Sequence, residues 1–289
     1  CVSLDDLDIK KNLKTIALLG YACDEGVKRN QGRIGAEHGP DEIRKSLGKF
    51  PNHLATETQL LDCGSINCVN DDMEIAQINL AEKITLLLSK NVLPIVLGGG
   101  HDIAYGHFNG IKTHLGNKKI GIINFDSHFD LRLNTNGNNS GTPFYQIAQD
   151  CITDNSPFNY LCLGIRKDAN DKMLFETAAK LDVKYLETEH FNMHYLEHVQ
   201  LILMQFIEDV DYIYTTIDLD GFSSAYAPGV SAPSPMGFSP DIVLECLKVI
   251  IDSKKLISLD IAEMNPKYDI DGQSAKLAAS LVHFVMHTV

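Results

Sequence analysis

The chain has 289 residues, and its 44% hydrophobic content is enough to bury a sizeable core in one large α/β domain or two small ones. Its 38 acidic residues outnumber its 25 basic residues, which gives a formal net charge of -13. This balance argues against a nucleic-acid partner, because a phosphate-binding surface needs clustered positive charge. An acidic surface suits an enzyme that acts on small molecules, or a protein that binds metal ions.

The longest apolar runs, residues 91–97 and 160–165, are far shorter than the roughly 20 residues needed to cross a bilayer, so we expect no membrane partner. The seven cysteines are odd in number and include no Cys-x-x-Cys pair, which indicates neither a disulfide framework nor a zinc ribbon. Cys1 in place of methionine is compatible with the modified first residue of a processed lipoprotein, but no membrane-associated feature follows it. We expect a cytoplasmic protein with reduced thiols.

Short β-branched or apolar runs alternate with segments of helical periodicity along the chain. The expected strands are residues 15–19, 59–62, 92–97, 120–125, 160–163, 183–186, 212–217 and 256–261. The expected helices are residues 75–89, 103–114, 196–207, 240–251 and 273–287, with a further helix start marked by Pro40 and Asp41. The alternation predicts an α/β fold with a parallel sheet covered on both faces, and no linker divides the chain, so we expect one domain over residues 1–289.

Two loop regions stand out by composition. Residues 133–143 are rich in Asn, Ser, Thr and Gly, and residues 221–237 are rich in Ser, Ala, Pro and Gly. Each follows a strand that ends in acidic residues. Open parallel α/β sheets usually bind ligands there, beyond the carboxyl ends of their strands.

The strongest chemical signal is the apolar strand that runs into Asp126-x-His128-x-Asp130. Alternate side chains of an extended backbone share a face, so these three potential metal ligands can converge on one point. The structural alternative is a polar strand end with solvated acids. A second strand ends in Asp218-x-Asp220 with the same spacing, and two such endings in one sheet favour metal binding over turns that merely favour Asp.

A third strand ends in Gly98-Gly99-Gly100-His101. Three glycines could form a phosphate cradle, but the Walker pattern and the spaced dinucleotide fingerprint are both absent, and no Lys follows. A lone histidine is more often structural. The acidic strand ends around it nevertheless lead us to interpret His101 as a ligand brought in by a tight turn.

The candidate ligands at the three strand ends are more numerous than one catalytic metal ion normally needs. They suit two ions that share bridging carboxylates. The predicted ligands are His101, Asp126, His128, Asp130, Asp218 and Asp220. Four carboxylates and two imidazoles without a thiol make two Mn(II) ions our first choice, with Zn, Fe, Co and Ni left open. Such a pair would lower the pKa of a bridging water, so a hydrolytic reaction is expected.

The three blocks, in this order, resemble the metal-binding blocks of the arginase-type ureohydrolases. The likeness extends over nearly the whole chain and includes the segments 32–40, 227–233 and 260–266. It implies a three-layer α/β/α sandwich around an eight-stranded parallel sheet, which matches the strand count above.

The resemblance also implies a role for each ligand. One ion would be held by His101, Asp126, Asp130 and Asp218, and the other by Asp126, His128, Asp218 and Asp220, so that Asp126 and Asp218 bridge. Glu263 would hold the cationic amidine or guanidine of the substrate, although from sequence alone it could merely cap the end of the last strand. Asp220 could relay the proton after attack by the bridging hydroxide.

Within the superfamily, the blocks at 100–108, 126–132 and 140–144 look most like those of formimidoylglutamases. Ser140 stands where arginases carry an active-site histidine, which puts arginase activity in doubt. The implied reaction, a step of histidine degradation, is hydrolysis of N-formimidoyl-L-glutamate to L-glutamate and formamide. Two rivals remain: another ureohydrolase acting on a guanidino acid, such as a guanidinobutyrase or agmatinase, and a non-catalytic metal-binding protein on the same fold.

Arg132 lies two residues beyond Asp130 and could form a bidentate, charge-assisted pair with a substrate carboxylate. Arg166 could share that task, with a surface pair to Asp168 or Asp171 as the alternative. His107, His114, His283 and His287 have helical or strand-flanking settings that suit packing or solvent, and we assign them no catalytic role. The expected partners are a small dicarboxylate substrate and further copies of the chain in a homo-oligomer.

Overall fold

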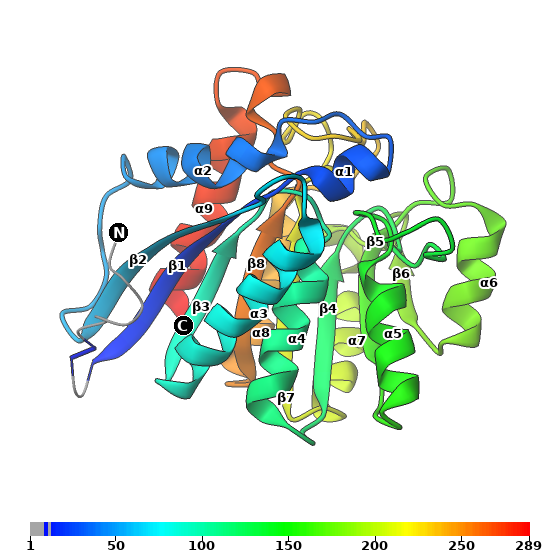
Figure 1. Ribbon diagram of the computed structural model, residues 1–289, viewed down its shortest axis with the longest axis horizontal. Coiled ribbons are helices and arrows are strands. Elements are labelled where there is room, and N and C mark those ends of the chain that lie inside the picture. The colour runs from blue at the N-terminus through cyan, green and yellow to red at the C-terminus, as the bar shows by residue number, and fades with distance from the viewer. Residues whose placement is uncertain (1–8, 11–12) are drawn as a thin grey trace.

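The computed structural model describes residues 9–10 and 13–289, so Cys1 lies outside the described residues. The strands are β1 (Lys14–Ala22), β2 (Thr58–Asn67), β3 (Val92–Leu97), β4 (Ile120–Phe125), β5 (Asn159–Ile165), β6 (Lys184–Glu187), β7 (Tyr212–Asp218) and β8 (Leu256–Ala262). They form one eight-stranded sheet in which every pairing is parallel (Figure 1). The predicted fold class is confirmed, and all eight expected strands are present.

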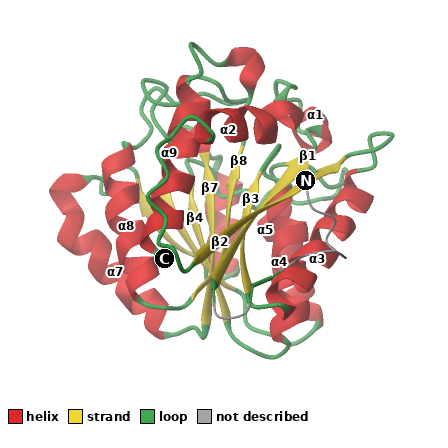
Figure 2. Ribbon diagram, turned by 90° about the vertical axis from the view of Figure 1, so that its left-hand side faces the viewer, coloured by secondary structure: helices red, strands yellow, loops and turns green. Residues whose placement is uncertain are grey.

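The helices are α1 (Glu25–Arg29), α2 (Gly39–Leu47), α3 (Met73–Ser89), α4 (Ile103–Leu115), α5 (Pro143–Thr153), α6 (Lys172–Lys180), α7 (Leu196–Glu208), α8 (Pro240–Asp252) and α9 (Gln273–Thr288). Helices α2, α7, α8 and α9 cover one face of the sheet, and α3 to α6 pack on the other, as the two sides of Figure 2 show for most of them. This is the expected three-layer sandwich. No helix in the described part of the chain is long and apolar enough to cross a membrane.

The sequence prediction omitted α1, α5 and α6. Helix α5 begins at Pro143, the last residue of the irregular segment 133–143. The lack of helical periodicity in that segment obscured the start of the helix in the sequence. Helix α6 is only nine residues long, and it begins where the Asp171 side chain accepts a hydrogen bond from the backbone N–H of Leu174. Such short helices depend on packing against the sheet more than on a long periodic pattern.

The strand order is β2-β1-β3-β8-β7-β4-β5-β6, so the chain leaves a gap between β3 and β4 and fills it later with β7 and β8. The carboxyl ends of these four central strands are therefore neighbours. A reversal of strand order of this kind opens a crevice above the sheet, which is where α/β proteins bind their ligands.

The two faces of the central strands differ in polarity. On β7 and β8, Ile213, Ile217 and Leu259 point toward α7, α8 and α9 in an apolar core. The alternate residues, among them Thr216 and Asp260, are also fully buried but polar, and they face the side covered by α4. Because buried polar groups cost free energy unless they are hydrogen-bonded, this second face needs a defined network of partners.

Helix α4 approaches α3 closely because two of its residues lack side chains. A Cβ atom at Gly106 would lie 2.6 Å from the Gln77 carbonyl oxygen, and one at Gly110 would lie 2.6 Å from that of Ala81. The Gln77 side chain also donates a 2.8 Å hydrogen bond to the Asp102 carbonyl at the start of α4. These contacts fix α4, and with it the turn that precedes it.

That turn, Gly98 to Gly100, is tied to the strands on both sides of β3. Gly98 N–H donates to the Ile261 carbonyl at 2.7 Å, and Gly99 N–H donates to the Tyr21 carbonyl at 2.8 Å. The space at Gly99 is the most restricted, since a Cβ atom there would lie 1.9 Å from the Cys23 carbonyl oxygen. The glycines thus allow the backbone to run close to β1 before His101.

We expect Gly99→Ala to reduce the free energy of unfolding by about 1–3 kcal/mol, because the added methyl group must displace the backbone of Cys23, directly after β1. Urea unfolding measures this change. Gly48→Ala is the matched control, since its Cβ atom would lie 3.4 Å from the nearest oxygen, in ordinary contact. We expect a change of about 0.5 kcal/mol or less there; equal effects at the two positions would contradict the packing argument.

Candidate metal centre

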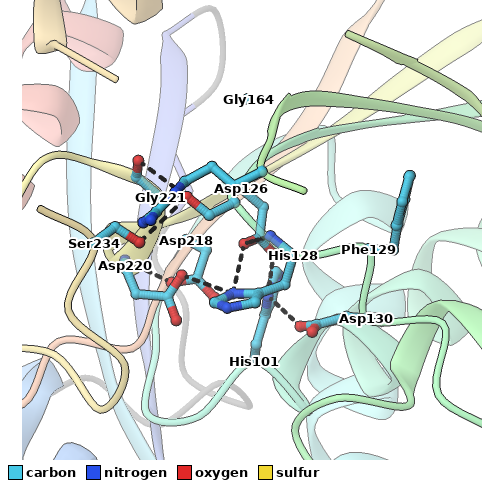
Figure 3. Close-up of polar contacts among 12 residues, drawn as sticks. His101, Asp126, His128, Phe129, Asp130, Gly164, Asp218, Asp220, Gly221 and Ser234 are labelled. Atoms are coloured by element: carbon cyan, nitrogen blue, oxygen red, sulfur yellow. Dashed lines mark hydrogen bonds and ion pairs between the residues drawn. The ribbon is translucent and has the colours of Figure 1, made fainter. Parts of the chain in front are cut away.

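All six predicted ligands lie together above the carboxyl ends of β3, β4 and β7 (Figure 3). His101 Nδ1 lies 2.9 Å from Asp218 Oδ2, 3.0 Å from Asp130 Oδ2 and 3.3 Å from Asp126 Oδ2. These four side chains form a first group that could hold a cation.

A second group consists of Asp126, His128 and Asp220. His128 Nδ1 lies 3.3 Å from Asp126 Oδ1 and 3.3 Å from Asp220 Oδ1. Asp126 therefore offers one oxygen to each group, as expected for a bridging carboxylate. Asp218, the other expected bridge, belongs only to the first group, and its Oδ1 accepts a 2.8 Å hydrogen bond from the backbone of Asp220.

The first carboxylate of each acidic motif is held in place by the backbone that follows it. Asp126 Oδ1 accepts a 2.7 Å hydrogen bond from the backbone N–H of His128, as Asp218 does from that of Asp220. In each case the first carboxylate is fixed by the residue two positions later, a common arrangement for Asp at the end of a strand. Asp130 then returns to the cluster with a φ of 48°, in the left-handed region that Asp tolerates better than most residues.

The hydrogen bonds of His101 determine which of its ring nitrogens faces the cluster. The Thr216 hydroxyl donates to Asp260 Oδ1 at 2.5 Å, and it lies 3.0 Å from His101 Nε2. A hydroxyl has one proton, so here it must accept from His101 Nε2–H. His101 can then offer the Nδ1 lone pair to a cation.

The residues present fit a pair of metal ions. His101 Nδ1, Asp220 Oδ1 and Glu263 Oε2 are buried and have no hydrogen-bond partner. Acceptor atoms that face one another in a buried site are stable when a cation lies between them. Carboxylate oxygens and imidazole nitrogens are ligands for Mn, Zn and related ions, and no thiolate competes.

Charge in the cluster shifts the ionisation of its members. Burial alone would lower the pKa of His101, but the charge of Asp218 and the close contacts with the neighbouring carboxylates raise that pKa well above its usual value. Burial, followed by the Asp218 charge, raises the pKa of Asp220 well above its usual range. Burial and the charges of Asp218 and Asp220 do the same to the pKa of Glu263. In the absence of a cation, protons bound to these side chains therefore compensate the negative charge of the cluster.

The cluster lines a cavity of about 300 Å³, which also contains Glu263, Ser140 and Arg132. Glu263 follows β8 with a φ of 65°, and its backbone N–H donates to the Gly99 carbonyl at 2.7 Å. Its Oε1 accepts a 2.9 Å hydrogen bond from the backbone of His101. The other oxygen, Oε2, has no partner and is available to a ligand.

Arg132 and Ser140 lie on one wall of the cavity and share a neighbour, Asn30. The Asn30 amide donates to Ser140 Oγ at 3.1 Å, and Arg132 donates to its carbonyl oxygen at 3.3 Å. Arg132 is exposed, whereas Ser140 is buried. The guanidinium thus lies at the open side of the cavity.

Arg166 is the one predicted substrate contact that the structure does not bring into the cavity. Its guanidinium forms a two-point pair with Asp168, with contacts of 3.0 Å and 2.6 Å. It lines a separate depression beside Glu187 and Glu189. This agrees with the surface ion pair that we gave as the alternative.

The sequence analysis missed Asn30 and Arg33, which also line the cavity. Arg33 donates to the backbone carbonyls of Val230 and Ser231, and its guanidinium lies 4.0 Å from the centre of the Tyr268 ring. It therefore holds the loop that forms the opposite wall. The only sequence signal was its place in the segment 32–40, which carried the family likeness without an assigned role.

Comparison with known proteins identifies the superfamily. The model of the "Arginase family" matches residues 14–287. The chain belongs to the arginase family. It is therefore a hydrolase with a binuclear metal centre, and the six residues above are its predicted ligands.

Among relatives, the chain is 45% identical to a formimidoylglutamase of Aeromonas salmonicida over 93% of its own length and 85% of the relative's. It is 41% identical to a formimidoylglutamase of Clostridium tetani over 99% and 86% of the two chains. Its fold is similar to that of formimidoylglutamase from Bacillus subtilis, with a TM-score of 0.85 at 24% identity over 99% and 91% of the two chains. A Trypanosoma cruzi formiminoglutamase with Mn²⁺ also has a TM-score of 0.85, at 22% identity over 99% and 96%.

We expect Mn²⁺ to raise the melting temperature of the metal-free protein, and to do so more at about pH 8 than at about pH 6. The sign follows from the raised pKa of His101 and His128, whose protons must leave when a cation binds. Thermal unfolding in buffers of both pH values measures the effect. Asp126→Asn should abolish most of the shift, and Asp168→Asn, on the surface, should retain it; a shift that is independent of Asp126 would contradict the predicted site.

Proposed function

We propose that this chain hydrolyses N-formimidoyl-L-glutamate to L-glutamate and formamide. The observation that carries the proposal is the distribution of charge in the cavity, with carboxylates at its base and free arginine at its mouth. The substrate has the complementary arrangement, a cationic amidine at one end and two carboxylates at the other. The identity of 41% and 45% to proteins named formimidoylglutamase supports the same assignment.

The arginines of the chain divide into two classes. Three of the five form ion pairs: Arg29 with Glu74, Arg44 with Asp62 and Arg166 with Asp168. The other two, Arg132 and Arg33, form no ion pair with any described residue, and both line the cavity. Arg33 already donates to two carbonyls, so Arg132 is the better candidate to bind a carboxylate, and Arg33 adds positive charge nearby.

At the base of the cavity, two bound cations would polarise the substrate and lower the pKa of a water molecule to supply the nucleophile. The Glu263 carboxylate would accept a hydrogen bond from the amidinium and orient the formimidoyl carbon for attack. Its fixed position, between the Gly99 and His101 backbones, limits the rotation of the bound group.

Asp220 would take up the proton of the attacking water and deliver it to the departing glutamate nitrogen as the C–N bond breaks. Its buried Oδ1, which has no hydrogen-bond partner, suits a group that accepts this proton and passes it on. Ser140 accepts from Asn30, so its own hydroxyl proton is free to bind a substrate carboxylate. Its hydroxyl cannot shuttle protons at neutral pH as an imidazole can, which fits a substrate other than arginine.

We further propose that Mn(II) is the native metal, on the basis of the oxygen-rich ligand set and of the Mn²⁺ in the T. cruzi relative. A cytoplasmic location is supported by the six described cysteines, which are all free thiols. A dicarboxylate as the small-molecule partner follows from the argument above, and a homo-oligomer remains our expectation.

The products distinguish this proposal from its nearest rival. We expect Mn-loaded protein to convert N-formimidoyl-L-glutamate to formamide and glutamate faster than it releases urea from guanidinobutyrate, agmatine or arginine. Chromatography of the products measures both. Preferred release of urea would reassign the enzyme to a guanidino acid, and turnover of none of these substrates would favour a metal-binding protein without catalysis.

Arg132→Ala should reduce kcat/KM for N-formimidoyl-L-glutamate by about 10- to 100-fold, the value of a charge-assisted hydrogen bond of roughly 1.5–3 kcal/mol. The loss should lie mainly in KM, because the guanidinium binds the tail rather than the reacting carbon. Arg166→Ala is the matched control and should change kcat/KM little, since Arg166 pairs with Asp168. Equal losses in the two variants would contradict the assignment of Arg132.

A further inference from the structure

A buried carboxylate, Asp260, lies beneath the candidate metal centre and is fully shielded from solvent. It is on β8, paired in register with Thr216 of β7. Its Oδ1 accepts from the Thr216 hydroxyl at 2.5 Å, and its Oδ2 accepts from the Tyr214 hydroxyl and lies 2.6 Å from His107 Nδ1. Two hydroxyls thus donate to this carboxylate, and His107 Nδ1 is placed to donate to it as well.

The second nitrogen of His107 is also constrained. His107 Nε2 lies 2.6 Å from Ser258 Oγ, and Ser258 Oγ lies 2.9 Å from the Pro94 carbonyl oxygen. Ser258 thus links His107 to β3 on the side away from Asp260.

Both ring nitrogens of His107 therefore have a partner, and His107 and Asp260 form a pair with no exposed surface. A buried polar side chain without such partners would be strongly destabilising. The sequence analysis gave His107 no role beyond packing; the hydrogen bonds give it one.

We propose that His107 is a positioning residue that holds the Asp260 carboxylate in place, and that this buried pair acts through Thr216 to keep the His101 Nδ1 lone pair directed at the metal ions. The chain of contacts runs from Ser258 through His107, Asp260 and Thr216 to His101. Because the Thr216 hydroxyl donates its proton to the Asp260 carboxylate, Thr216 can only accept from His101. Loss of the carboxylate would free the hydroxyl to turn.

The backbone supports this arrangement in two ways. Tyr214 and Thr216 of β7 are in register with Ser258 and Asp260 of β8, so their side chains share one face of the sheet. The close approach of α4 to α3 at Gly106 and Gly110 holds His107 against that face. The inference rests on the metal centre and not on the identity of the substrate.

The first test is the protonation state of His107 in the full-length, metal-free protein. Two-bond ¹H–¹⁵N spectra of protein labelled at histidine distinguish protonated from unprotonated ring nitrogens, and His107→Gln identifies the signal. We expect His107 Nδ1 to carry a proton, because it faces the Asp260 carboxylate. A signal that shows an unprotonated Nδ1 would overturn the proposal, whether or not any variant folds.

The second test is the affinity for Mn²⁺ alone, measured by titration calorimetry. His107→Gln and Asp260→Asn should each weaken binding by about 10- to 100-fold, as for other residues that orient a metal ligand. Thr216→Val should do the same and Thr216→Ser should not, because serine keeps the hydroxyl. His114→Gln, an exposed position on the same helix, is the control and should bind as the unaltered protein does.

If His107 acts through Thr216, the double variant of His107→Gln and Thr216→Val should bind Mn²⁺ about as weakly as either single variant. Variants that lower the melting temperature but leave Mn²⁺ affinity unchanged would reduce His107 to a structural role and refute the proposal. Losses that multiply in the double variant would refute the relay through Thr216. None of these measurements uses a substrate, so failure of the proposed reaction would leave them unaffected.

Discussion

Mutual repulsion among buried carboxylates is the constraint on which the rest of this structure depends. Asp126, Asp130, Asp218 and Asp220 lie close together at the end of the sheet, and Glu263 faces the same cavity. Each buried charge costs several kcal/mol unless it is compensated. The protein compensates part of this cost with backbone N–H donors at Asp126, Asp218 and Glu263, and leaves the remainder to cations.

The same constraint explains where the rigid and the variable parts of the site lie. Groups that hold cations need fixed geometry, and they lie on or next to the ends of central strands. The groups that we expect to contact the substrate tail, Arg132 and Ser140, lie on a loop that covers the cavity. A change in the loop can alter the substrate specificity without disturbing the metal ligands. One metal centre can in this way serve several amidine and guanidine substrates.

Much of this arrangement could be predicted because the informative residues are local in sequence. The strands are buried on both faces, so they appear as apolar runs, and each acidic motif follows its strand directly. What could not be predicted depends on partners far along the chain. Arg33 is an example, because it contacts the loop at Ser231, which is 198 positions away. For Arg166 the sequence left two roles open, and the structure shows the pair with Asp168.

His107 and Asp260 are the clearest example of that limit. They are 153 positions apart, and neither is a predicted metal ligand. The available signal was a few polar residues at alternate positions of two strands, Thr216 on β7 and Ser258 and Asp260 on β8. Without the strand order, nothing indicated that these positions face one another, or that a helix would bring a histidine to them.

The strand order has a consequence for folding during synthesis on the ribosome. The two central strands, β7 and β8, are the last to be synthesised, since β7 begins only at residue 212 of 289. Until they emerge, β3 and β4 expose unpaired edges on two separate half-sheets, a condition that invites misassociation. The insertion of β7 and β8 closes both edges and completes the metal centre together, so a nascent chain gains its catalytic site and its protection from aggregation in the same step.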